Sequence, residues 1–63
     1  MNWQTGIPKL NQTSGKSKLL LCKAVFDGWM YPTIAFYNSI TKEWIEANLK
    51  PVKGEVTKWC EID

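Results

Sequence analysis

The fold is decided by residues 18–37, which read KLLLCKAVFDGWMYPTIAFY. The apolar segment Lys18–Phe26 runs into Asp27-Gly28, and a second apolar segment follows directly. An Asp-Gly pair favours a two-residue β-hairpin turn because both positions tolerate positive φ. This stretch therefore predicts two antiparallel strands joined by a tight turn.

A two-residue turn also fixes which side chains face each other across the hairpin. One face, largely apolar, pairs Leu19 with Phe36, Leu21 with Ile34 and Val25 with Met30, and the other pairs Leu20 with Ala35, Cys22 with Thr33, Ala24 with Tyr31 and Phe26 with Trp29. In this register Pro32 faces Lys23, although proline lacks an N–H and belongs at an edge or a bulge. A looser turn over Asp27–Pro32, with the second strand beginning at Thr33, is the alternative.

The segments outside the hairpin are shorter and more polar. Residues 1–17 are rich in Gly, Pro, Ser, Thr, Asn and Lys, which predicts an extended arm pinned by Trp3. Residues 38–41 suit a turn, and Glu55–Ile62 suits a final strand.

Residues 42–49 fit two structures equally well. Thr41 would cap a helix and Pro51 would stop it, while a strand around Glu43–Ala47 suits the same residues. We therefore expect one mainly β domain over residues 1–63, with the arm at 1–17 and a β core at 18–63. The expected fold is a small antiparallel β-meander of three to four strands, or a partly closed barrel, with an extended N-terminal arm. The alternative is the hairpin followed by a short helix at 41–49 and a final strand.

Aromatic residues are the main compositional signal. The chain of 63 residues contains four Trp, two Tyr and two Phe, and each such side chain buries about 150–250 Å². A domain this small has a thin margin of stability, so aromatic packing is the expected supplement. Trp44 and Trp59 stand among charged neighbours, a pattern typical of one buried ring among solvated side chains, and we expect both in the core.

The charge is +2 overall and unevenly divided. Residues 1–25 carry four lysines and no acid (+4), whereas residues 26–63 carry four lysines and six acids (−2). The absence of arginine disfavours sequence-specific reading of nucleic acid. Lysines still neutralise phosphates as point charges, so the basic half supplies candidate nucleic-acid contacts. These are Lys9, Lys16, Lys18 and Lys23.

The chain lacks the groups on which most enzyme sites are built. It contains no histidine, the commonest general base near neutral pH. Cys22 stands in an apolar segment, and with Cys60 it is too little for a zinc site, so we expect two buried free thiols rather than a disulfide. Residues 15–17 (Gly-Lys-Ser) match only the end of a phosphate-binding loop, because Leu10 stands where that motif needs glycine. We expect no enzymatic activity, no cofactor and no metal.

Binding is the function that remains. Trp29, Met30 and Tyr31 lie together near the predicted hairpin tip. Trp and Tyr are enriched among interface anchors, and Met on surfaces that adapt to partners. Each of the three suits a core position singly, but consecutive strand residues point to opposite faces, so at least one stays exposed in so small a domain. These three are the candidate partner-binding residues, and Trp29 or Tyr31 is the one we expect to be exposed.

Several motifs stand in order along the chain: Trp3 and then Pro8, Gly15-Lys16 before an apolar strand, Asp27-Gly28, Trp44, and the closing Val56-Thr57-Lys58-Trp59. Together they resemble a family of small domains of unknown function that is common in bacteriophages and prophages. That family usually has His where this chain has Lys58, and it ends on a Pro-containing tail. The resemblance implies a phage or prophage origin, a strand around Trp44 and action in the cytoplasm of a bacterial host. It carries over no site residues.

The leading hypothesis is a small phage or prophage accessory protein that binds and modulates a partner protein of the host or phage. Inhibition of a host enzyme or defence complex is one such role. A module that binds single-stranded nucleic acid is the alternative, and a self-associating structural piece is the third possibility. The longest apolar run, Leu19–Cys22, is too short to span a membrane, so we expect no membrane insertion.

Overall fold

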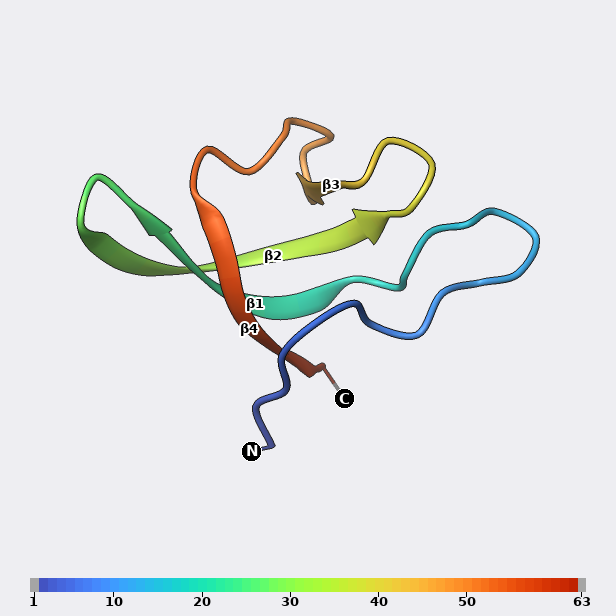
Figure 1. The fold of residues 1–63 in the computed structure, drawn as a ribbon, viewed down its shortest axis with the longest axis horizontal. Helices are drawn as coiled ribbons and strands as arrows, with labels where there is room; N and C mark the ends of the chain where they lie inside the picture. Colours follow the sequence, from blue (N-terminus) through green and yellow to red (C-terminus); the bar gives the residue numbers. More distant parts are fainter. Residues whose placement is uncertain (1, 63) are drawn as a thin grey trace.

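The chain forms one four-stranded antiparallel sheet (Figure 1). The computed structural model describes residues 2–62. The strands are β1 (Leu20–Phe26), β2 (Trp29–Asn38), β3 (Glu43–Glu46) and β4 (Glu55–Glu61). Within the described residues there is no helix long and apolar enough to cross a membrane. The predicted mainly β class is confirmed.

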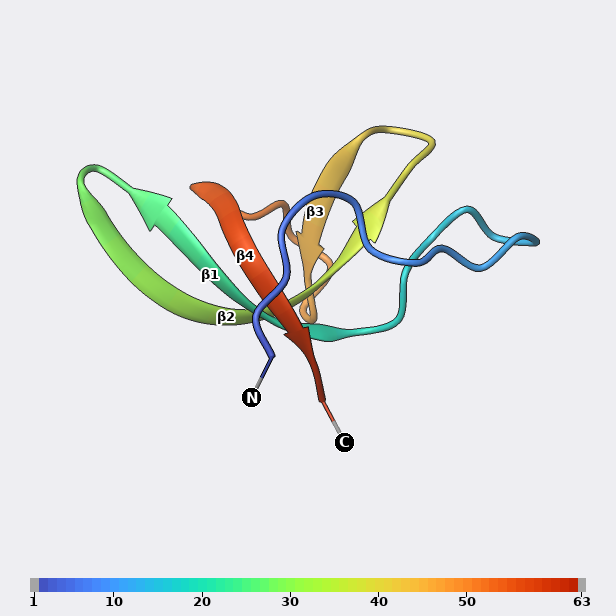
Figure 2. The ribbon, with the colours of Figure 1, turned by 60° about the horizontal axis from the view of Figure 1, so that its bottom comes forward.

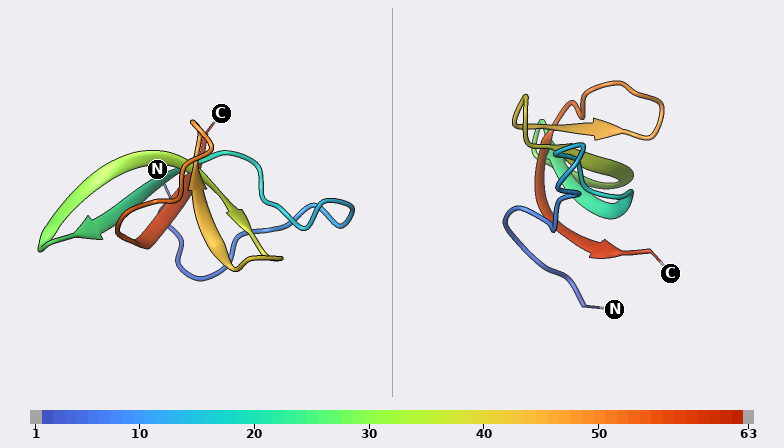
Figure 3. Two further views of the ribbon diagram at one scale, coloured as in Figure 1. Left: turned by 90° about the horizontal axis from the view of Figure 1, so that it is seen from above. Right: turned by 90° about the vertical axis from the view of Figure 1, so that its right-hand side faces the viewer.

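The strands lie in the order β3-β2-β1-β4. The first three follow one another as a meander, and the connection after β3 brings β4 back to the free edge of β1. This is the strand order of a Greek key. The sheet is open, and β1 and β2 curve along their length (Figures 2 and 3).

The β1–β2 hairpin has the predicted register. Phe26 lies opposite Trp29, and the pairing continues without a shift along the hairpin. Asp27 and Gly28 have φ values of 52° and 80°, as a two-residue turn between twisted strands requires. The tight turn is therefore confirmed, and the looser turn over Asp27–Pro32 is wrong.

Pro32 is tolerated within β2 because β3 is short. Hydrogen-bonded and non-hydrogen-bonded pairs alternate along an antiparallel hairpin. Counted from the turn, the Lys23–Pro32 pair is of the second kind, so the nitrogen of Pro32 faces away from β1. β3 pairs with β2 only over Ala35–Asn38. The nitrogen of Pro32 thus faces an open edge, where the missing N–H costs no ladder hydrogen bond.

The segment after the second turn contains a strand, and the alternative helix at 41–49 is wrong. Trp44 lies opposite Tyr37 of β2, and their rings pack edge to face with centroids 5.3 Å apart. On the other side of β3, the N–H of Val52 donates to the carbonyl oxygen of Trp44 at 3.0 Å. Pairing on both sides and the aromatic contact together outweigh the local helix preference, which is a weak determinant.

The core lies on one face of the sheet. Leu20, Cys22 and Ala24 alternate along β1 and are buried together with Ala35 of β2. Trp59 of β4 lies opposite Cys22 and is only 7% exposed. Trp44, Val52 and Val56 are partly buried and pack against this cluster. Trp59 is thus in the core as predicted, whereas Trp44 is half-buried at its margin.

The larger apolar pairs of the hairpin lie on the opposite face. Leu21 and Val25 are half-buried there, while Ile34 and Met30 are exposed. The hairpin pattern alone does not decide which face is buried. β4 and β3 decide it, because each directs a tryptophan to the face that carries the small residues of β1.

The N-terminal arm runs along the outer edge of β4 (Figure 2). The backbones of Gln4 and Trp59 exchange hydrogen bonds of 2.7 and 2.9 Å. Trp3 is half-buried, and the ammonium groups of Lys23 and Lys58 lie 5.9 and 5.2 Å from the centre of its ring. These cation–π contacts make Trp3 the pin of the arm, as predicted.

Cys22 and Cys60 are both buried and both thiols are free, which confirms the prediction. Burial raises the pKa of the Cys22 thiol from 9.0 to about 11. At neutral pH this thiol is almost entirely protonated, and a protonated thiol is not a nucleophile. Cys22 therefore serves as a small core residue.

Candidate binding surfaces

The turn end of the β1–β2 hairpin projects beyond the rest of the sheet (Figure 1). β4 pairs with β1 only as far as Val25, and β3 pairs with β2 only from Ala35 onward. Within residues 2–62, therefore, no strand lies beside either edge of residues 26–30, which we call the hairpin tip. The tip is a projecting two-stranded extension of the sheet, and its shape is maintained by its own turn and by the sheet from which it extends.

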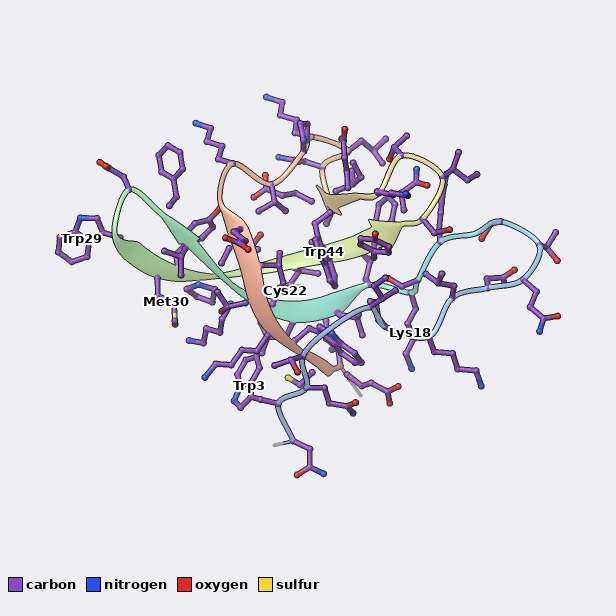
Figure 4. All side chains as sticks on the ribbon, in the orientation of Figure 1. Trp3, Lys18, Cys22, Trp29, Met30 and Trp44 are labelled. Atoms are coloured by element: carbon purple, nitrogen blue, oxygen red, sulfur yellow. The ribbon has the colours of Figure 1, made fainter. Side chains whose placement is uncertain are left out.

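Three large apolar side chains are exposed on the hairpin tip. Phe26 is 50% exposed, Trp29 76% and Met30 55%. Figure 4 shows Trp29 at the outer end of the tip, pointing away from the molecule. Because Phe26 lies opposite Trp29, the two rings share one face of the hairpin, and Met30 lies on the other face. Apolar surface gathered in this way is typical of an interaction site.

The structure separates the three predicted partner-binding residues. Trp29 and Met30 are exposed, but Tyr31 is half-buried. Its hydroxyl oxygen accepts a hydrogen bond of 3.4 Å from the backbone N–H of Gly54, so Tyr31 ties the hairpin to the connection between β3 and β4. Phe26 was not among the predicted site residues. Its place directly before the turn and opposite Trp29 is the signal that identifies it.

A second surface lies at the opposite end of the molecule, where the loop formed by residues 8–18 meets β1 and β4. A cleft of about 500 Å³ opens there, and we call it the basic cleft. The ammonium group of Lys18 lies 3.5 Å from the carboxylate of Glu61, and both side chains are well exposed. The cleft is lined by the apolar residues Pro8, Leu10, Leu20 and Trp59, the polar residues Asn11, Ser14 and Ser17, and the charged residues Lys9, Lys16, Lys18 and Glu61.

Three of the four predicted nucleic-acid contacts come together in the basic cleft. They are Lys9, Lys16 and Lys18. Lys23 is not among them, because it lies in the middle of β1 with its ammonium group over the ring of Trp3. The sequence grouped these four by charge alone, and the fold divides them between two places.

Local hydrogen bonds fix the loop that carries Lys16. The side-chain oxygen of Asn11 accepts from the N–H groups of Thr13 and Ser14, at 2.8 and 3.2 Å. The N–H of Gly15 donates to the carbonyl oxygen of Asn11 at 2.8 Å, and Gly15 adopts a φ of 70° that favours glycine. The loop thus closes on itself around Asn11.

Two serines join this loop to β2. The buried hydroxyl of Ser17 accepts from the N–H of Tyr37 at 2.8 Å and donates to the carbonyl oxygen of Lys18 at 2.9 Å. The hydroxyl of Ser39 donates to the carbonyl oxygen of Gly15 at 2.6 Å. The wall of the basic cleft is therefore a fixed part of the fold.

Neither surface has the groups of a metal centre. In the part of the chain that the structure describes, no three His, Cys, Asp or Glu side chains gather as metal ligands would. Comparisons of the chain with protein-family models, with curated proteins and with solved structures found no match.

Proposed function

We propose that this chain is a binding domain without enzymatic activity, which docks on a partner protein through its hairpin tip. The observation that carries the proposal is the exposure of Phe26, Trp29 and Met30 on a projecting hairpin tip that no other strand of the described residues flanks. Burying apolar surface against a partner contributes about 25 cal/mol per Å².

The hairpin tip also suits recognition because its backbone is already ordered. The turn at Asp27-Gly28 and the contact between Tyr31 and Gly54 hold it in place. A preformed loop loses less conformational entropy on binding than a flexible one. Tryptophan is enriched among residues whose truncation costs about 2 kcal/mol or more of binding free energy. Trp29 is thus the central anchor of the proposed interface.

The resemblance to small phage and prophage domains supports a wider proposal about the partner. That partner is a host or phage protein in the cytoplasm of a bacterium, and docking modulates it, for example by inhibiting a host enzyme or a defence complex. Such a role needs a complementary surface and no chemistry. It agrees with a chain that contains no histidine and holds Cys22 as a protonated core thiol.

Affinity capture from a bacterial lysate tests this function. The baits are the wild-type domain, Trp29→Ala and Ile40→Ala; Ile40 is 75% exposed, but it lies in the turn between β2 and β3. We expect a protein that the wild-type and Ile40→Ala baits retain and the Trp29→Ala bait loses. Equal capture by all three would reject the hairpin tip as the docking surface. Light scattering over a concentration series separates a monomeric binder from a self-associating piece.

Binding of single-stranded nucleic acid is the second candidate, and the three lysines of the basic cleft favour it. Proteins of that kind combine a basic groove with aromatic rings on which bases stack. The hairpin tip carries the exposed rings of Phe26 and Trp29. It lies at the opposite end of the molecule from the loop formed by residues 8–18 (Figures 1 and 3), which weighs against this candidate. It predicts an affinity for a mixed oligonucleotide that falls steeply with salt, with a smaller slope in K16Q/K18Q. No binding at low salt would dispose of it.

A further inference from the structure

The basic cleft offers many hydrogen-bond donors and few acceptors. Three lysines are among the residues that line it. Asn11 uses its side-chain oxygen on the loop backbone, which leaves its amide nitrogen as a donor. Ser14 accepts from the N–H of Lys16 at 3.3 Å and keeps its hydroxyl proton to donate. A lining of this kind selects a ligand rich in acceptor oxygens.

The charge of the basic cleft selects the same class of ligand. Among the described residues of the lining, three lysines stand against the carboxylate of Glu61, which gives these residues a net charge of +2. Because Lys18 and Glu61 have side chains 63% and 58% exposed, their ion pair contributes little to stability. A competing anion therefore displaces Glu61 from Lys18 at small cost.

The lining of the basic cleft is partly apolar. The apolar residues of the lining are buried or half-buried, and we call them the floor: Pro8, Leu10, Leu20 and Trp59. The indole nitrogen of Trp59 already donates to the carbonyl oxygen of Gly6 at 2.9 Å, so the indole has no free polar group to offer a ligand. The volume of about 500 Å³ lies within the range of about 300–1,000 Å³ typical of small-molecule sites. The cleft thus suits a ligand with one anionic end and one apolar part.

We propose that the basic cleft binds a small organic phosphate. Lys9, Lys16 and Lys18 hold the phosphate group through charge-assisted hydrogen bonds, and the apolar part of the ligand rests on the floor. A phosphate monoester carries close to two negative charges at neutral pH, which matches the charge of the lining. The site does not depend on the proposed function, because the hairpin tip lies at the other end of the sheet (Figure 1).

Titration of the ¹⁵N-labelled protein, followed by NMR, tests the proposal. The probes are adenosine 5′-monophosphate, adenosine and inorganic phosphate. We expect the nucleotide to bind with a Kd of about 1 mM or tighter, and roughly tenfold more tightly than either half of the molecule alone. The signals that shift should be the amides of residues 9–18 and the indole N–H of Trp59, whose side chain belongs to a residue of the lining.

Variants of matched charge locate the site. K16Q/K18Q should weaken binding of the nucleotide about tenfold, whereas K50Q/K53Q, which removes the same charge from the β3–β4 connection, should not. Glu61→Gln removes the carboxylate that pairs with Lys18, so it should tighten binding about two- to threefold. A gain of affinity cannot come from loss of folding.

Four results would overturn the proposal. They are no binding of the nucleotide at millimolar concentration, equal binding of adenosine, equal binding of inorganic phosphate, and weaker binding by Glu61→Gln. A further titration uses a mixed single-stranded DNA decamer as the probe. One outcome is that the decamer binds far more tightly than the mononucleotide and also shifts the amide signals of Lys23 and Lys58. In that case the ligand is a nucleic-acid strand, and the small-phosphate site is rejected. The proposal is supported if the decamer, counted per phosphate group, binds no more tightly than the mononucleotide and shifts only the amide signals of residues 9–18.

Discussion

Cys22 lies in the middle of β1 with no exposed surface, and its ionisation is coupled to folding. Burial, with a smaller contribution from Cys60, raises the pKa of its thiol to about 11. The thiol of the unfolded chain loses its proton near pH 9, so between about pH 9 and 11 the unfolded state binds fewer protons than the folded state. The free energy of unfolding must therefore fall as pH rises through this window, by on the order of 2 kcal/mol at its end.

Urea unfolding at pH 7, 9 and 10.5 measures this dependence. Lysine and tyrosine side chains also titrate at high pH, so the control is Cys22→Ala, which lacks the thiol and keeps those groups. We expect the free energy of unfolding of the wild-type protein to fall more steeply with pH than that of Cys22→Ala. Parallel pH dependences in the two proteins would contradict the account of Cys22 as a buried, protonated thiol.

For single residues, the neighbours in sequence predicted burial where they were clearly apolar or clearly charged. Cys22 stands among apolar residues, and Trp59 follows Lys58 and stands two residues before Glu61. Context predicted that Trp29 or Tyr31 is exposed, and Trp29 is. It could not choose between the two, because the partner of Tyr31, Gly54, lies 23 positions further along the chain. No local pattern shows a contact of that range, so the exposure of Tyr31 was predictable only once the β3–β4 connection was placed.

Among the connections between elements, the one that carries Gly54 fits tightly against the hairpin. A Cβ atom added at position 54 would overlap the backbone carbonyl of Val25, and a backbone group cannot swing aside as a flexible side chain does. We expect Gly54→Ala to lower the free energy of unfolding by about 1–3 kcal/mol. In a domain this small, that is a fall in Tm of about 4 °C or more.

Thermal unfolding of Gly54→Ala and of Lys53→Ala checks this expectation. Lys53 is the exposed neighbour of Gly54, and replacing it should change the free energy of unfolding by less than about 0.5 kcal/mol. If both variants melt with the wild-type protein, the connection does not pack against the hairpin as described.

Elements formed by residues close together in sequence could be predicted, whereas elements that depend on distant residues could not. The Asp27-Gly28 turn is local, and it predicted the whole β1–β2 register from two residues. β3 is short and contains both helix formers (two Glu) and strand formers (Trp and Ile), so its state depends on the ring contact of Trp44 with Tyr37 and on Val52 at its other edge. A strand that is formed by partners on both sides cannot be distinguished from a helix by its own residues.

For the whole molecule, the two binding surfaces stand at opposite ends of a body whose longest extent is 35 Å. They share no residue, and the sheet between them is one continuous unit. We expect the two sites to act independently. Trp29→Ala should bind adenosine 5′-monophosphate with wild-type affinity, and K16Q/K18Q should bind the captured partner with wild-type affinity. Loss of both activities in either variant would mean that the two surfaces are coupled or that the variant is unfolded.

The arrangement of the whole molecule was the part that the sequence predicted least. The return of β4 to β1 depends on Trp59 covering Cys22, a contact across 37 positions of the chain. The basic cleft likewise forms because backbone hydrogen bonds between residues 15–17 and 37–39, together with the hydroxyls of Ser17 and Ser39, hold the loop against the end of β2. The lysines were visible as a charged half of the chain, but their division between the cleft and Trp3 is a property of the fold.

The affinity of the captured partner for the wild-type domain and for Trp29→Ala, measured by calorimetry, tests the central claim most directly. Truncation of an interface anchor costs about 2 kcal/mol or more, which corresponds to a Kd roughly thirtyfold weaker. Because Trp29 is 76% exposed and outside the core, the variant should keep the Tm of the wild-type protein within a few degrees. Unchanged affinity, or a large fall in Tm, would contradict the assignment of the hairpin tip as a binding surface.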